Sequence, residues 1–184
     1  TGKEMIEYIN NSPDNLDVLW FHIWPNAYKD NTTALAKQKL SNGNFDLQNA
    51  TQEEIGYISN LNFTINDEEA DWEYHPEHID ICKIILNEPI KTGESIIIKT
   101  PFKVKIPDAK FSRLGHIDQS YMITQWYPKP AVYDKEGWHI IPYLDQGEFY
   151  SEFGTFDVKI TLPKNYIVGA TGNLQNQDEL RELE

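Results

Sequence analysis

The chain has 184 residues, of which 40% are hydrophobic and 24% charged, so it can form one folded domain with a sizeable core. Its formal net charge of −13 argues against nucleic acids and anionic membrane surfaces as partners, because binding phosphates requires clustered Lys and Arg. No apolar run approaches the ~18 residues of a membrane-spanning helix, and the first residues lack the apolar centre of a signal peptide.

Alternation of apolar and polar residues predicts a chain built mainly of β-strands. In chain order the runs are EMIEYIN, LDVLWFHIW, NLNFTIND, HIDICKIILN, TPFKVKIP, YMITQWY, FDVKITLP and NYIVGATG. Turn signals such as Asn11-Ser12-Pro13-Asp14 separate them. About eight strands with few helices predict an all-β fold, a saddle-shaped antiparallel β-sandwich.

Residues 33–57 break this pattern. Their Ala- and Lys-rich beginning predicts a short helix, and a second, weaker helical piece is expected to start at the capping sequence that opens on Thr51. We therefore expect a short helical insertion between strands.

The remaining chain gives no sign of a second domain, so we expect a single β domain over residues 1–184. The polar end QNQDELRELE and a start directly on a strand favour a domain truncated at both ends.

Short motifs give little chemistry. In HPEH, His75 and His78 are three apart with Pro76 between them, whereas a zinc helix places two histidines four apart, so we expect a structural loop and no metal site. His22 lies in an apolar run and is expected to be a hydrogen-bonded strand residue. The only cysteine, Cys82, excludes an intrachain disulfide and is expected to be inert.

Carboxylates and aromatic rings are concentrated near the end of the chain. Asp145 with Glu148, or Glu148 with Glu152, could perform glycosidase chemistry, but a solvated acidic loop is the simpler interpretation. Residues 125–154 combine many Trp, Tyr and Phe with Pro and Gly. These rings either form a platform that stacks on sugars or build a core for an irregular segment, and periodicity does not separate the two.

Longer motifs carry a resemblance. The runs YMITQWYPKPAVYD, GWHIIPYL and GEFYSEFGTFDVKITLPKNYIVGATGNLQ resemble the N-terminal domain of zinc aminopeptidases of the aminopeptidase N family, the gluzincins. The upstream run INNSPDNLDVLWFHIWPNAY is similar to the bacterial branch of that family. The resemblance covers residues 6–175, and residues 33–57 match least.

The resemblance implies a non-catalytic domain of a zinc metallopeptidase. In that family a saddle-shaped β domain packs on a thermolysin-like catalytic domain, which carries H-E-x-x-H and a downstream Glu as zinc ligands; this chain has neither. The implied cofactor is therefore zinc in the full-length protein only, and the implied partners are the catalytic domain of the same polypeptide and a peptide substrate. A periplasmic, cell-envelope or secreted location follows from analogy with bacterial relatives.

One residue is carried over from the family. Counting nine residues back from Pro128 gives Gln119 as the side chain that contacts the free amino terminus of the substrate. The family often has a second Gln two positions earlier, where this chain has Ile117, so His116 and Asp118 are the alternatives. A carboxamide oxygen can accept hydrogen bonds from an ammonium group.

Two other functions stay open at this point. The chain could be a self-sufficient carbohydrate- or peptide-binding module that uses Trp126, Trp138 and Tyr143 as its platform. It could also be a scaffold from a relative that has lost its zinc ligands.

Overall fold

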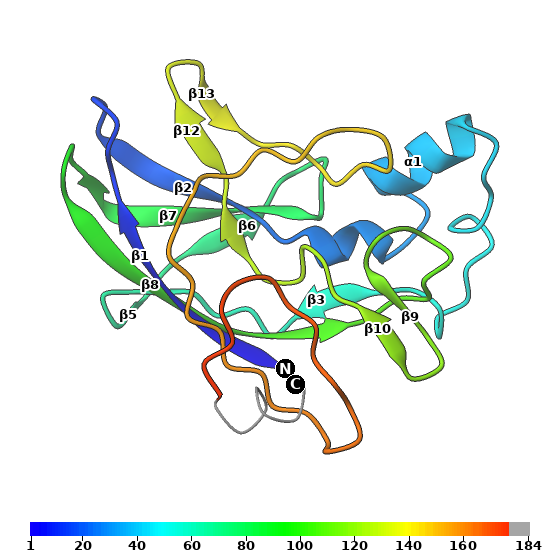
Figure 1. Ribbon diagram of the computed structural model, residues 1–184. Helices are drawn as coiled ribbons and strands as arrows, with labels where there is room; N and C mark the ends of the chain where they lie inside the picture. Colours follow the sequence, from blue (N-terminus) through cyan, green and yellow to red (C-terminus); the bar gives the residue numbers. More distant parts are fainter. Residues whose placement is uncertain (177–184) are drawn as a thin grey trace. The chain divides into compact units, whose positions relative to one another are not determined.

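Two antiparallel sheets dominate the first part of the chain in the computed structural model, which describes residues 1–176 (Figure 1). The chain divides into two units, residues 1–152 and a second unit that begins at Phe153. Both sheets belong to the first unit. The expectation of an all-β, sandwich-like fold is confirmed.

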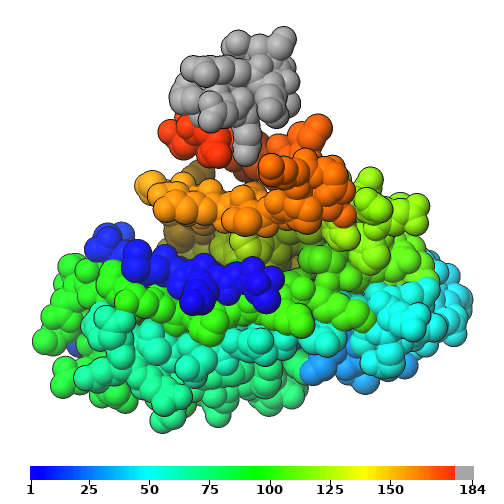
Figure 2. All heavy atoms as spheres, turned by 90° about the horizontal axis from the view of Figure 1, so that it is seen from below, coloured from blue at the N-terminus to red at the C-terminus, as the bar shows by residue number. Residues whose placement is uncertain are grey.

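The first sheet is built around its longest strand. Its order is β1 (Gly2–Ile9), β8 (Ser95–Lys105), β4 (Thr64–Ile65) and β5 (Glu68–Glu69), and β3 (Tyr57–Ser59) also pairs with β8. The register of β1 on β8 is unbroken from Gly2 opposite Phe102 to Ile9 opposite Ser95. Figure 2 shows β1, in dark blue, lying along the green residues of β8. The strand β8 therefore has ladder partners along nearly its whole length.

The second sheet contains the other pair of long antiparallel strands, β2 and β7. Its order is β11 (Lys129–Pro130), β2 (Leu16–His22), β7 (Ile81–Ile90) and β6 (Trp72–Tyr74). Two small hairpins stand apart from both sheets: β9 (Gly115–Ile117) with β10 (Ser120–Met122), and β12 (Val132–Asp134) with β13 (Gly137–His139).

Side chains from both sheets meet in one core. Leu19 and Phe21 of β2 and Ile84 of β7 are buried together with Ile98 and Phe102 of β8. Each strand contributes alternate residues, as expected for sheets with one face inward. Burial of these apolar side chains is the main stabilising contribution to a sandwich of this kind.

A second core cluster lies around the 3-10 helix η1 (Trp24–Tyr28) and the helix α1 (Ala34–Ser41). Trp24 and Tyr28 of η1 pack there with Leu35 of α1 and with Phe111 and Tyr143. Neither helix among the described residues is long and apolar enough to cross a membrane.

The insertion of residues 33–57 contains one helix where the sequence predicts two pieces. Thr33 caps α1, since its hydroxyl accepts from the N–H of Ala36 at 3.2 Å. The second predicted helix is wrong: the carboxylate of Glu54 accepts from the N–H of Thr51 at 2.8 Å, and only a single turn forms. Gly56 follows at once, and β3 begins at Tyr57, so no residues remain to continue the helix.

Two predicted strands are also wrong, and a third is only partly formed. The run at residues 121–127 forms only the short strand β10, and Gln125 has a φ of 50°, which interrupts extended backbone. The runs at residues 156–163 and 165–172 lie in the second unit, where the described residues contain no strand. A strand requires a ladder as well as an alternating pattern.

Candidate functional site

The residue expected to bind substrate lies in the turn of a β-hairpin. In the hairpin β9–β10, Ile117 pairs with Ser120, so Asp118 and Gln119 form a two-residue turn. Asp118 has a φ of 50°, in the left-handed region that Asp tolerates better than most residues. A two-residue hairpin turn requires positive φ at its first central position in both favoured types. The local sequence thus places Gln119 at the tip.

The base of this hairpin is held firmly. The N–H of His116 donates to the carbonyl of Pro107 at 3.0 Å, and the carbonyl of His116 accepts from the N–H of Ala109 at 3.0 Å. At Gly115 an added Cβ would lie 2.4 Å from the Cα of Ala109, so only glycine allows this close approach. Leu114, which precedes it, is buried in the second core cluster.

The tip, in contrast, is exposed and partly apolar. Ile117 is 66% exposed and Met122 is 63% exposed. The register places both on the same face of the hairpin, because a residue and the diagonal position across the ladder share a face. On the opposite face the ring of His116 stacks on that of Tyr121, with 5.5 Å between centroids. A rigid base with an exposed apolar tip is typical of an element that contacts another molecule or domain.

The structure separates Gln119 and Asp118 from the third candidate, His116. Gln119 and Asp118 are exposed at the turn, whereas His116 is half-buried at the anchored end of β9. The carboxamide of Gln119 makes no hydrogen bond with any of residues 1–176. The Nδ1 atom of His116 is buried and lacks a hydrogen-bond partner among the same residues. Of the three side chains, Gln119 and Asp118 can reach a ligand from the tip.

The HPEH motif forms a tight loop. The Nδ1 atom of His75 accepts from the N–H groups of Glu77 and His78, each at 3.2 Å, and the two imidazole rings stack with 5.0 Å between centroids. In the described part of the chain no group of three His, Cys, Asp or Glu side chains could hold a metal ion. The Nδ1 of His75 is thus occupied in fixing the loop.

Two of the other predicted chemical groups, Cys82 and Asp145, have structural surroundings. Cys82 is fully buried in β7, and burial raises the pKa of its thiol, which disfavours the reactive thiolate. The carboxylate of Asp145 lies 3.2 Å from the ammonium of Lys39 and accepts from the hydroxyl of Ser112 at 3.2 Å. Glu148 and Glu152 are exposed.

The aromatic segment builds a core. Tyr143 is fully buried, with its ring centroid 5.1 Å from that of Phe149 and 6.1 Å from that of Trp24. Trp126 and Trp138 pack against the core between the sheets. The platform formed by Trp126, Trp138 and Tyr143 is therefore corrected: Tyr143 has no surface to offer a sugar.

A buried lysine was missed by sequence reasoning. The ammonium of Lys129 donates to the side-chain oxygens of Gln125 and Ser151, both at 2.7 Å, and lies 4.1 Å from the ring centroid of Trp24. Burial lowers the pKa of Lys129 to about 8. Its partners are 4, 22 and 105 positions away in the sequence, so no local motif could reveal them. The two hydrogen bonds and the ring contact give this ammonium a structural role.

The neighbouring His22 is also buried. The register of β11 on β2 places Lys129 opposite His22, whose Nε2 atom accepts from the N–H of Ile141 at 3.2 Å. Burial, together with the nearby Lys129 charge, lowers the pKa of His22 to about 3. His22 is thus a neutral, hydrogen-bonded strand residue, as the sequence predicts.

Comparisons with known proteins add no relative. No protein family model, no curated protein and no solved structure matches the chain.

Proposed function

We propose that this chain is the non-catalytic N-terminal β domain of an aminopeptidase N family zinc peptidase. In this proposal it caps the catalytic cleft and helps to recognise the amino terminus of the peptide substrate. The sequence motifs from residue 121 onward, with the upstream run at residues 9–28, support the family, and the all-β fold is the one that the resemblance implies.

The observation that carries the proposal is the position of Gln119 at the tip of an anchored, exposed hairpin. Its carboxamide oxygen can accept a hydrogen bond from a substrate ammonium, and its amide group can donate to a carbonyl. The apolar flank of Ile117 and Met122 gives the hairpin a surface to bury against a neighbouring domain. An element that is rigid at its base can hold such a side chain in place at low entropic cost.

Zinc enters this proposal only through the catalytic domain that the resemblance implies, which lies outside the 184 residues of this chain. Among residues 1–176 no group of three His, Cys, Asp or Glu side chains could hold a metal ion. Its own part would be binding and orientation of the substrate.

The first test is to read the parent coding sequence beyond Glu184. We expect an H-E-x-x-H motif followed by a downstream Glu. A reading frame that ends at Glu184, or that continues without these ligands, would contradict the assignment to an active zinc peptidase. The remaining hypotheses would then be a scaffold or a binding module.

The second test is kinetic and uses the intact peptidase. We expect Gln119→Ala to lower kcat/KM for substrates with a free amino terminus about tenfold or more, because a hydrogen bond to a charged group is lost. Gln119→Glu should retain most activity, since a carboxylate also accepts from an ammonium. Ser120→Ala is the matched control in the same hairpin. Unchanged kinetics for Gln119→Ala would remove Gln119 from the site.

A carbohydrate-binding module finds less support. Its predicted platform includes the fully buried Tyr143, and the remaining two tryptophans pack against the core.

A further inference from the structure

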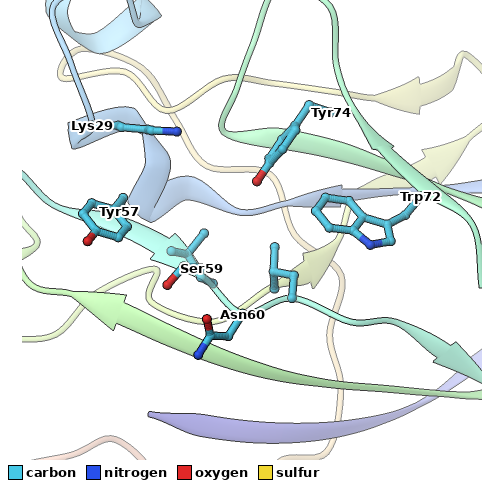
Figure 3. A pocket seen from close by; sticks show the side chains of 8 residues that line it. Lys29, Tyr57, Ser59, Asn60, Trp72 and Tyr74 are labelled. Atoms are coloured by element: carbon cyan, nitrogen blue, oxygen red, sulfur yellow. The ribbon is translucent and has the colours of Figure 1, made fainter.

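A groove lies between β3 of the first sheet and β6 of the second sheet. It has a volume of about 300 Å³ and is lined by Lys29, by Trp72 and Tyr74 of β6, and by residues 57–61, which include β3 and the two residues after it. Figure 3 shows Trp72 and Tyr74 on one side and Tyr57, Ser59 and Asn60 on the other. A second hollow of about 280 Å³ adjoins it and shares Tyr74; it is lined by Thr32, Thr33, His75, Pro76, Glu77 and Ile79.

The strand β6 borders this groove with unused backbone groups. Among residues 1–176 it is the last strand of its sheet and pairs with β7 alone. The N–H of His75 donates to the carbonyl of Ile81, and the N–H of Ile85 donates to the carbonyl of Asp71. The backbone N–H and C=O groups of residues 71, 73 and 75 therefore point toward β7. Because the direction of backbone groups alternates along a strand, the N–H and C=O groups of residues 72 and 74 point to the open edge.

Two side chains of the same strand, Trp72 and Tyr74, line the groove. The rings of Trp72 and Tyr74 lie 5.2 Å apart on one face, and Trp72 contacts the core residue Phe63. On the other face Glu73 is paired with Lys83 at 2.7 Å. An extended segment added to β6 would thus meet backbone groups along the edge and aromatic rings on its inner side.

The groove also contains an ammonium group that has no counter-charge. In the part of the chain that the structure describes, the side chain of Lys29 makes no ion pair or hydrogen bond. Figure 3 shows its nitrogen directed toward Tyr74, whose hydroxyl points into the groove. Neither this hydroxyl nor that of Tyr57 has a partner among residues 1–176. An acidic side chain beside Lys29 could accept from its ammonium group and from the hydroxyl of Tyr74.

The geometry points to a peptide-binding site in which an extended segment of another protein pairs with the edge of β6 and places an Asp or Glu side chain beside Lys29. Side chains two residues apart on an extended peptide lie on the same face. One enters the groove at Lys29, and the next enters the adjoining hollow beyond Tyr74. This site is independent of the proposed peptidase function, because it uses none of the residues of the hairpin β9–β10.

A nuclear magnetic resonance titration of the 184-residue chain tests this site. The probe is a heptapeptide, acetylated and amidated at its ends, in which threonine and valine alternate around a central glutamate. We expect saturable shifts of the backbone amides of Trp72 and Tyr74. Replacing the central glutamate by glutamine should weaken binding about tenfold or more, since a charge-assisted hydrogen bond is lost. A peptide with N-methylated backbone at alternate residues should not bind if these groups form the ladder.

The substitution Lys29→Met is the matching change on the protein. It should weaken binding of the glutamate peptide to the level of the glutamine peptide and leave the latter unchanged, whereas Lys37→Met, on the exposed face of α1, should have no effect. Three results would overturn the proposal: no saturable shift at β6, equal affinity for the glutamate and glutamine peptides, or binding of methyl glucoside in place of either peptide. Shifts at β6 that depend on protein concentration without peptide would assign the edge to a second copy of this chain instead.

Discussion

Two segments of the molecule have nearly the same sequence pattern and different structures. Residues 102–107 read FKVKIP and belong largely to β8, whereas residues 156–163 read FDVKITLP and contain no strand. Phe102 is 4% exposed, and Phe156 is 65% exposed. The alternation is equal in both, so it cannot be the deciding factor. What β8 has in addition is β1 and β3 as ladder partners.

The comparison shows that an alternating sequence favours a strand but forms one only where neighbouring strands pair with it. Ladder hydrogen bonds and cross-strand contacts supply most of the stabilisation of a strand, and intrinsic preference supplies little. Around residues 156–163 the side chains of Val158, Ile160 and Leu162 are each about half exposed. Four experiments can break or sharpen this contrast.

The largest expected difference is in amide hydrogen exchange. Ile98 of β8 is buried and is paired with Ile6 on one side and with Ile65 on the other. Its amide should exchange through global unfolding, with protection of about 10³ or more. The amides of Val158 and Ile160 should exchange close to the rate of an unfolded peptide, as followed by nuclear magnetic resonance after transfer to deuterated water. Equal protection at the two segments would show that the comparison is wrong.

Truncating one phenylalanine in each segment comes next. We expect Phe102→Ala to lower the free energy of unfolding by about 3–5 kcal/mol, because it leaves a cavity between the sheets. Phe156→Ala is the matched variant and should cost less than about 1 kcal/mol, as is usual for an exposed position. Urea unfolding followed by tryptophan fluorescence measures both. A large cost for Phe156→Ala would place residues 153–176 in the cooperative unit.

Glycines in the two units give a smaller contrast. Gly115→Ala should cost about 1–3 kcal/mol, because the new Cβ meets the backbone of Ala109 and the hairpin base must shift. Gly169 has open space around the position of an added Cβ. Gly169→Ala should therefore change the free energy of unfolding by less than about 1 kcal/mol. Thermal unfolding monitored by circular dichroism compares the two, and a similar loss for both would contradict the anchoring of the hairpin.

The sequence predicted the long paired strands well and the assembled sites poorly. The runs of β1, β2, β7 and β8 alternate over many residues, and each found a partner in the same unit. The backbone of Gln125 lies in the left-handed region and interrupts the strand predicted at residues 121–127, whose sequence pattern did not differ from that of the strands that formed. The role of Gln119 stays a prediction from its position in a long motif, whereas the turn that exposes it follows from the neighbouring Asp118.

No pattern in the sequence predicted the groove beside β6 or the pairing of the buried Lys129 with His22. Lys29, Tyr57 and Tyr74 are far apart in the chain and come together only when two sheets pack. Lys129 is opposite His22 through strand pairing between residues more than a hundred positions apart. A reader of the sequence can recognise local patterns, but such sites depend on long-range register.

The smallest expected contrast between the two units is in how acid changes the free energy of unfolding, and it depends on the histidines. All five lie before residue 140, and the second unit contains none. The pKa of His22 is about 3 in the folded chain, below its ordinary value of 6.5, so between these values the unfolded chain binds a proton that the folded chain does not. Stability contributed by His22 is therefore lost as the pH falls from about 6.5 toward 3.

Asp80 acts in the opposite direction over part of this range. Burial raises its pKa to about 6 from 3.8, so the folded chain binds the extra proton there and gains stability as the pH falls. Comparison of the parent chain with His22→Gln isolates the histidine, because both retain Asp80 and glutamine keeps an acceptor for the N–H of Ile141. Between pH 6 and pH 4, the parent should lose about 1 kcal/mol more per pH unit than the variant in urea unfolding. Parallel pH profiles would mean that the folded chain protonates His22 near its ordinary pKa of 6.5, and hence that the sheet around β2 does not shield this imidazole from water.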